Sequence, residues 1–187
     1  MTKYTLNELF TIQRKESVLF PFNLVFNPTD LAEIALDFTG LFYLFYKGEL
    51  LYIGEGNSGR KSETPTNRIQ KQLSTITLRG ADVCFKGKVI DLILSIPELN
   101  TFVSKNLLNQ LNGSSESSVN KIHFAAQHWE TFAFLENIGL KHFTLVIKDL
   151  KDLKVDVSEL KTKCLSEKNR YLPRCNKEYN QVKTNLK

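Results

Sequence analysis

Two tyrosines, Tyr43 and Tyr52, and the arginine Arg68 have side chains and spacing that could perform chemistry together. The tyrosines lie on the two halves of the stretch 41–54, which reads LFYLFYKGELLYIG. A phenol can orient or deprotonate a water molecule when nearby positive charge lowers its pKa from about 10. A guanidinium is always charged and binds two phosphate oxygens at once. These side chains therefore indicate chemistry on a phosphate group.

The stretch 41–54 predicts two short aromatic strands joined by a tight turn at Lys47 and Gly48. A two-residue hairpin loop requires positive φ angles, and Gly48 accepts one readily. A loop of this length pairs Tyr46 with Glu49 and sets the register of the two strands.

The predicted register places Tyr43 opposite Tyr52. Directly opposed residues share one face of an antiparallel pair, with Cβ atoms about 5 Å apart, so the two phenols would stand side by side. A three-residue loop would instead place Phe42, which has no hydroxyl, opposite Tyr52. A third interpretation is that these aromatic side chains only fill one face of a sheet.

The hairpin resembles the signature of the GIY-YIG nuclease family, which has Gly-Ile-Tyr on a first strand and Tyr-Ile-Gly on a second. Here Tyr52–Gly54 is Tyr-Ile-Gly, whereas Gly40–Tyr43 is Gly-Leu-Phe-Tyr, with one residue more between glycine and tyrosine. A gap-free match puts Phe42 at the tyrosine position, and the hairpin register puts Tyr43 there.

The family also carries an arginine on the next helix, in the pattern Arg-(Ile/Leu)-x-x-His, which Arg68-Ile69-x-x-Gln72 resembles. Thr66 or Asn67 can cap a helix that starts near Arg68. Glutamine can position a water molecule but cannot titrate, so Gln72 could not transfer a proton.

Further basic residues could contact nucleic acid. Two of these basic residues lie in the loop between the Tyr-Ile-Gly motif and the arginine helix, which is longer here than in the family. Three more flank glycines in a predicted hairpin near residue 80, which could reach a DNA groove or be an ordinary structural hairpin. With the glutamine, the candidate contacts are Arg60, Lys61, Gln72, Arg79, Lys86 and Lys88.

A C-terminal strand and helix complete the resemblance. The β-branched and aromatic run 141–150 predicts a strand, and Asp156 or Ser158 starts a helix that continues to about Tyr171, before Pro173. The sequence Pro-Arg-Cys-Asn, ending at Asn176, resembles the family's Pro-x-x-Asn.

The family's metal-binding glutamate lies on this last helix, and three residues compete for its position. Glu167 is the preferred candidate, with an apolar residue four positions later. Glu159 is the second, although Asp156-x-x-Glu159 also reads as a capping box. Cys164 has the most usual spacing from Asn176, but a thiol is a poor ligand for a hard metal ion.

The resemblance implies a DNA endonuclease, of restriction type or from a mobile element, that hydrolyses phosphodiester bonds with Mg²⁺ or Mn²⁺. It implies that Glu167 holds the metal and that Arg68 stabilises negative charge. Tyr43 would act as the base, Tyr52 would orient the water, and Asn176 would donate a hydrogen bond to the phosphate or to the tyrosine. One alternative is a DNA-binding protein that keeps the fold without catalysis. Another is a protein-interaction module on the same scaffold, without affinity for nucleic acid.

The chain has 187 residues, of which 42% are hydrophobic, and a net charge of +5, which favours a polyanionic partner. We expect one α/β (α+β) domain over 1–187, with a small, mainly antiparallel three-stranded sheet (about 40–46, 49–54 and 142–148) flanked by helices. Its parts are a nuclease-like core (39–74 and 141–180), an N-terminal extension (1–38) with a helix from Thr29 to Leu36, and an insertion (75–140) with a helix over about 119–135.

The three cysteines form no CxxC pair, which favours a reduced, cytoplasmic setting. We expect neither a signal peptide nor a membrane span. Coordinated cleavage of both DNA strands would need two active sites, and a homodimer would supply them.

Overall fold

The structure is a computed structural model. It describes residues 1–15, 23–60, 63–77, 120, 121, 124, 137–166 and 173–176. Of the predicted site residues, Lys61, Arg79, Lys86, Lys88 and Glu167 lie outside these ranges. The predicted helix over 119–135 also lies outside them, except at residues 120, 121 and 124, which are helical.

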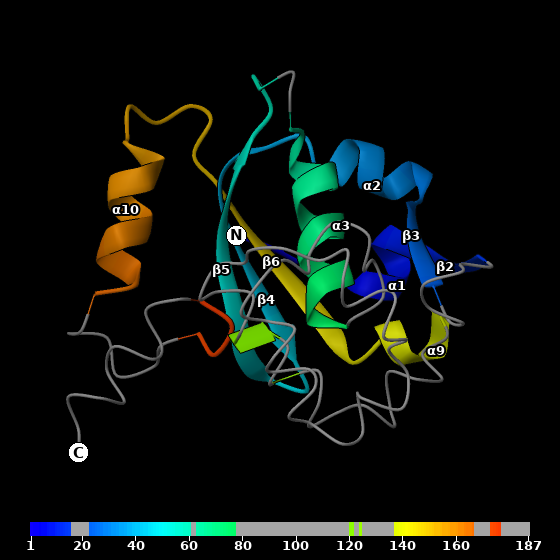
Figure 1. The fold of residues 1–187 in the computed structure, drawn as a ribbon. Helices are drawn as coiled ribbons and strands as arrows, with labels where there is room; N and C mark the ends of the chain where they lie inside the picture. The colour runs from blue at the N-terminus through cyan, green and yellow to red at the C-terminus, as the bar shows by residue number, and fades with distance from the viewer. Residues whose placement is uncertain are drawn as a thin grey trace, which may run out of the picture.

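An antiparallel sheet with the strand order β1-β6-β4-β5 forms the centre of the fold (Figure 1). Its strands are β1 (Thr2–Thr5), β4 (Thr39–Tyr46), β5 (Glu49–Asn57) and β6 (Phe143–Asp149). The predicted strands over 40–46, 49–54 and 142–148 are confirmed, as is a mainly antiparallel sheet flanked by helices.

Within the described residues this sheet has four strands, so the prediction of three was wrong. The additional strand, β1, comes from the N-terminal extension and pairs with β6, where Tyr4 lies opposite Leu145. Threonine and tyrosine, which favour strands, make up most of β1. Pairing with β1 satisfies the backbone groups along the outer edge of β6, which would otherwise be exposed.

The rest of the N-terminal extension packs beside this sheet. It contains a one-turn helix α1 (Leu6–Leu9), a two-stranded sheet of β2 (Phe10–Lys15) and β3 (Asn23–Pro28), and helix α2 (Asp30–Ala35). The predicted helix from Thr29 to Leu36 is confirmed, because these residues are its N-cap and C-cap.

Helix α3 (Pro65–Ile76) carries the predicted arginine and starts three residues earlier than expected. The hydroxyl of Thr64 accepts a hydrogen bond from the backbone N–H of Asn67 at 3.2 Å, as an N-cap does. Proline suits the first helical position because the N–H of that residue has no hydrogen-bond partner within the helix, so its absence costs nothing. Arg68 therefore lies at the end of the first turn.

Helix α10 (Val157–Cys164) begins where it was predicted, with Asp156 as its N-cap. It ends at Cys164 and does not reach residue 171, so the predicted end was wrong. The hydroxyl of Ser166 donates to the carbonyl oxygen of Lys163 at 2.9 Å, and such local side-chain bonds compete with a further helical turn. Residues 167–172 lie outside the described ranges.

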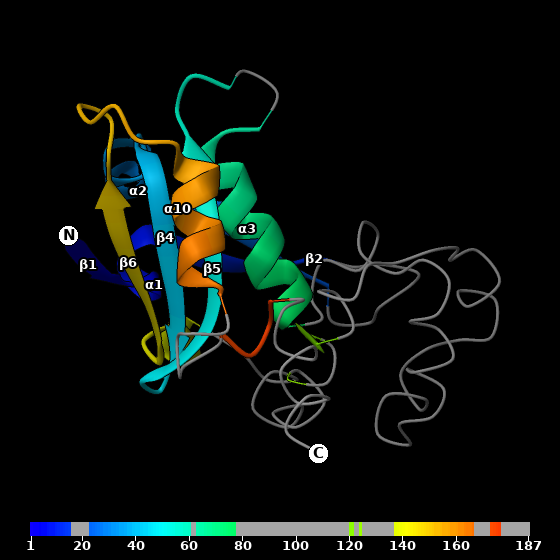
Figure 2. The same ribbon diagram turned by 90° about the vertical axis from the view of Figure 1, so that its left-hand side faces the viewer.

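Strand β5 lies at the sheet edge between two helices, with α10 on one side and α3 on the other (Figure 1). Figure 2, turned by 90°, shows the long axes of these helices running beside the strand. A short helix, α9 (Asn137–Leu140), precedes β6 and packs against α1. Strand β5 is therefore flanked by two helices, α3 and α10.

Strands β4 and β5 form the predicted hairpin with a two-residue turn. The turn residues Lys47 and Gly48 have φ angles of 47° and 84°. Tyr46 lies opposite Glu49, as predicted. Positive φ at both turn positions matches the right-handed twist of the strands.

The register shifts by one residue beyond the turn, at a β-bulge where Leu51 is the additional residue. Leu44, and not Tyr43, therefore lies opposite Tyr52. A bulge adds one residue to one strand and moves the later side chains of that strand to the opposite face. The shift overturns the predicted tyrosine pair.

Candidate functional site

The two predicted tyrosines lie on opposite faces of the sheet. Tyr43 pairs with Ile53, and its hydroxyl lies 4.0 Å from the sulfur of Cys164 on α10. The ring of Tyr52 lies on the other face, with its centre 5.9 Å from that of Phe42. Phe42, which the alternative register placed opposite Tyr52, contacts the Tyr52 ring but pairs with Gly54 in the sheet.

The environment of Tyr43 is unsuited to a general base. Burial, followed by the neighbouring Cys164 thiol, raises the pKa of Tyr43 to about 12. A phenol that serves as a base near neutral pH needs a pKa lowered from its ordinary value. The predicted role of Tyr43 as the base finds no support in this geometry.

Tyr52 belongs to a buried polar cluster with Gln72 and Lys121. The Lys121 ammonium donates to Oε1 of Gln72 at 2.5 Å and lies 4.9 Å from the centre of the Tyr52 ring. Gln72 is 8% exposed, so its side chain packs inside the molecule and is not positioned to contact DNA as predicted. Sequence reasoning missed Lys121, which lies in the insertion far from any motif.

Asn176 holds the edge strand. Its Oδ1 accepts from the backbone N–H of Ile53 at 2.9 Å, and its Nδ2 donates to the Ile53 carbonyl oxygen at 3.0 Å. The backbone N–H of Cys175 also donates to the carbonyl oxygen of Leu51 at 2.7 Å, so this segment runs along β5. The predicted hydrogen bond from Asn176 to phosphate or tyrosine is replaced by these backbone contacts.

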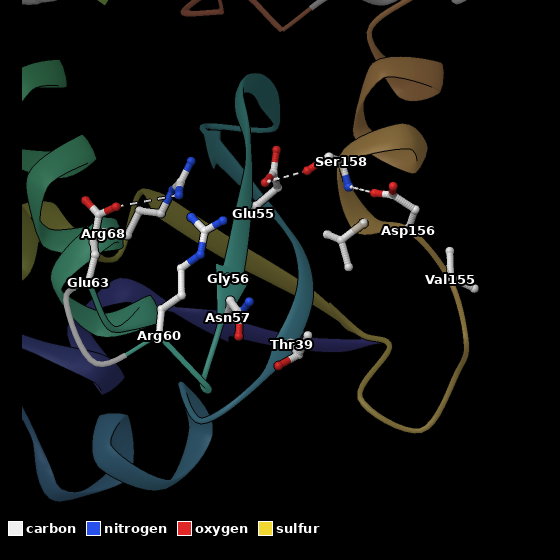
Figure 3. A pocket seen from close by; sticks show the side chains of 11 residues that line it. Thr39, Glu55, Gly56, Asn57, Arg60, Glu63, Arg68, Val155, Asp156 and Ser158 are labelled. Carbon is white, nitrogen blue, oxygen red and sulfur yellow. Dashed lines mark hydrogen bonds and ion pairs between the residues drawn. The ribbon is translucent and has the colours of Figure 1, made fainter.

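A cavity of about 300 Å³ opens where β5, α3 and α10 meet (Figure 3). It contains two of the predicted residues, Arg60 and Arg68, together with polar and apolar neighbours that were not predicted. The lining residues are Thr39, Glu55, Gly56, Asn57, Arg60, Glu63, Arg68, Val155, Asp156, Val157 and Ser158.

The two arginines reach the cavity from different elements. Arg68 extends from α3, is partly exposed, and lies 3.6 Å from a Glu63 carboxylate oxygen. Arg60 extends from the connection after β5, and both guanidinium groups point into the space between α3 and β5 (Figure 3). Within the described ranges, the exposed Arg60 guanidinium makes no ion pair.

Glu55 is a cavity residue that sequence reasoning missed, although it directly follows the Tyr-Ile-Gly motif. Its carboxylate oxygens lie 3.0 Å from the Lys161 ammonium and 3.3 Å from the Ser158 hydroxyl. Burial alone would raise the pKa of Glu55, but Lys161, the positive charge of Arg68 and the Ser158 hydrogen bond together lower it. Glu55 is therefore ionised at neutral pH and ties β5 to α10.

Asp156, at the start of α10, has a structural role as the helix cap. Asp156 accepts from the backbone N–H groups of Ser158 and Glu159 at 2.8 and 3.1 Å. The second metal-ligand candidate, Glu159, is exposed on the first turn and does not line the cavity. The α10 residue that faces the sheet beside Tyr43 is Cys164.

The carboxylates that line the cavity have polar or charged partners within the described residues. No three His, Cys, Asp or Glu residues gather as a metal site in the described part of the chain. Mg²⁺ is usually held by one or two carboxylates together with water molecules. Both oxygens of Glu55 are occupied by Lys161 and Ser158, and Glu63 lies beside Arg68.

The chain matches no protein-family model, no curated protein and no solved structure. Among its described helices, none is long and apolar enough to cross a membrane.

Proposed function

We propose that this chain binds DNA at the β5 cavity and hydrolyses phosphodiester bonds as a divalent-metal-dependent endonuclease similar to GIY-YIG nucleases. The observation that carries the proposal is the convergence of Arg60 and Arg68 on one cavity beside the Tyr-Ile-Gly strand. The order of hairpin, arginine helix, third strand and last helix supports it.

A phosphate group suits the chemistry of this cavity. The two guanidinium groups provide rigid, planar donors for phosphate oxygens. The cavity carboxylates do not oppose this, because Glu63 and Glu55 each lie beside a cation and Asp156 caps α10. Arg68, held in orientation by Glu63, would stabilise negative charge that develops on the phosphate.

The metal requirement and the restriction-type subclass rest on the resemblance of the sequence. In this proposal Glu167 is the metal ligand, and bound Mg²⁺ or Mn²⁺ would supply Lewis acidity. DNA is the partner, the setting is the cytoplasm, and a homodimer provides the second site for cleavage of both strands.

A DNA-binding protein without catalysis is the second candidate. The specific observation that favours it is the placement of Tyr43, which faces Cys164 on the opposite side of the sheet from Tyr52. A protein that keeps the cavity arginines but has no pair of tyrosines on one face of the sheet would bind phosphate without cleaving it.

A salt titration of DNA binding tests the role of the cavity. Removal of one phosphate contact lowers the slope of log K against log salt by about 0.9. We expect Arg60→Ala and Arg68→Ala to lower this slope, and Arg174→Ala to leave it unchanged. Arg174 is a matched control, because it has similar exposure and an ion pair with Glu49 away from the cavity. Equal slopes in all variants would mean that DNA binds away from the cavity. Cutting of DNA that depends on the metal ion distinguishes the endonuclease from the DNA-binding protein.

A further inference from the structure

Three residues of the insertion contact the hairpin or the predicted site residues, although the insertion lies outside the nuclease resemblance. Asn120, Lys121 and Phe124 are 6%, 6% and 0% exposed. The Phe124 ring packs edge-to-face on Tyr46 of β4, with ring centres 5.7 Å apart. This contact anchors Phe124 to the hairpin. Its two polar neighbours are therefore held beside β5.

Lys121 connects two of the predicted site positions. Its ammonium donates to Gln72 on α3 at 2.5 Å and lies 4.9 Å from the ring centre of Tyr52 on β5. Burial of an ammonium group is costly unless hydrogen bonds and favourable charge interactions compensate it. A cation over the face of a tyrosine ring is one such interaction.

Asn120 reaches the same strand by a second route. Its Nδ2 donates to the backbone carbonyl oxygen of Asn176 at 2.8 Å. The side chain of Asn176 in turn holds both backbone groups of Ile53, the residue after Tyr52. Consecutive residues of the insertion thus secure both the Tyr52 ring and the backbone beside it.

We propose that Lys121 is a positioning residue that fixes the Tyr52 ring and the Gln72 amide relative to each other. A lysine from the insertion thereby orders two of the predicted site residues, one on β5 and one on α3. The kinetic part of this inference rests on the proposed endonuclease function, whereas the structural part does not.

Amide hydrogen exchange of the full-length chain tests the positioning without any assay of activity. In Lys121→Met, which keeps a long side chain without charge, we expect the amides of residues 50–57 to exchange about tenfold faster or more. Lys3→Met is the control, because Lys3 is exposed on β1 at the opposite edge of the sheet. Exchange equal to that of the wild type would overturn the proposal. Gln72→Leu, which removes the acceptor, should give the same result and replaces Lys121→Met if that variant does not fold.

Cleavage kinetics test whether the positioning serves catalysis. We expect Lys121→Met to lower kcat about tenfold or more with KM for DNA nearly unchanged, because misplacement of a site group reduces the rate more than binding. Lys121→Arg, which keeps the charge, should recover part of the loss. Faster exchange with an unchanged kcat would overturn the catalytic role. If the wild-type chain cuts no DNA, the endonuclease proposal fails and hydrogen exchange alone decides the positioning.

Discussion

Gly54, the last residue of the Tyr-Ile-Gly motif, lies against the ring of Phe42. A Cβ atom at Gly54 would lie 2.2 Å from Cζ of Phe42, a distance at which the ring or the strand must move. The same ring packs beside Tyr52 and edge-on to Phe38. The motif glycine therefore has a packing role: it provides the space in which the aromatic residues of this face meet.

We predict that Gly54→Ala destabilises the fold by about 1–3 kcal/mol, the usual cost of overpacking a core. Thermal unfolding measures the change. Gly59→Ala is the control, since a Cβ there would lie no closer than 3.2 Å to a flexible Asn57 side chain. Phe42→Leu should relieve part of the loss in the Gly54→Ala background. Equal stability of Gly54→Ala and wild type would contradict this packing.

The raised pKa of Tyr43, about 12, gives a prediction at alkaline pH. The pKa of Tyr43 is higher in the folded chain than in the unfolded chain. Its contribution to stability is therefore fully present below pH 10.0 and is lost as the pH rises toward 12. We expect Tyr43→Phe to shift alkaline unfolding to higher pH and to remove one late-titrating phenol from the ultraviolet absorbance titration. If Tyr43→Phe instead removed a phenol that titrates near pH 10, the buried placement of the Tyr43 side chain would be contradicted.

At the scale of elements, Glu55 is the polar link between β5 and α10. Its ion pair with Lys161 is 3.0 Å long, and both side chains are about one-fifth exposed (20% and 22%). The Lys151–Asp37 pair is a contrasting surface contact, with side chains 55% and 61% exposed. Exposed pairs contribute little, so the helix position should depend on the first pair and not on the second.

We predict that Glu55→Gln lowers stability at neutral pH by about 1 kcal/mol, while Asp37→Asn changes it little. The sign of the pH dependence follows from the lowered pKa of Glu55: its contribution is present above the ordinary value of 4.5 and is lost as the pH falls through the lower folded value. Denaturant unfolding of both variants at neutral and acidic pH checks this. A difference between wild type and Glu55→Gln that persists at low pH would contradict the ionic link.

Local signals in the sequence predicted the elements well. The Lys47-Gly48 turn, the Thr29 cap and the Asp156 cap depend on residues close to each other in the chain, and each was found where expected. The bulge at Leu51 was not predictable by counting residues, because an ideal ladder has no local marker for an additional residue. That one shift separated Tyr43 from Tyr52.

At the scale of the whole molecule, two further missed features depend on contacts between distant segments. Strand β1 pairs with β6 across more than half of the chain, and Lys121 meets Gln72 and Tyr52 from the insertion. Asn176 was predicted as a site residue from its motif, whereas its role in holding Ile53 becomes visible when the C-terminal segment lies beside β5. Residue types supplied the candidate side chains, and tertiary packing determined which of them meet and what each one contacts.

Cleavage of supercoiled plasmid by the full-length chain, with Mg²⁺ or Mn²⁺ and with EDTA, tests the central claim most directly. We expect nicking or linearisation with the metal ion, no cutting with EDTA, and a loss of about 100-fold or more in Arg68→Ala but not in Arg174→Ala. Absence of cutting with both metals, on plain and modified DNA, would contradict the endonuclease proposal. Salt-dependent binding without cutting would then identify a DNA-binding protein.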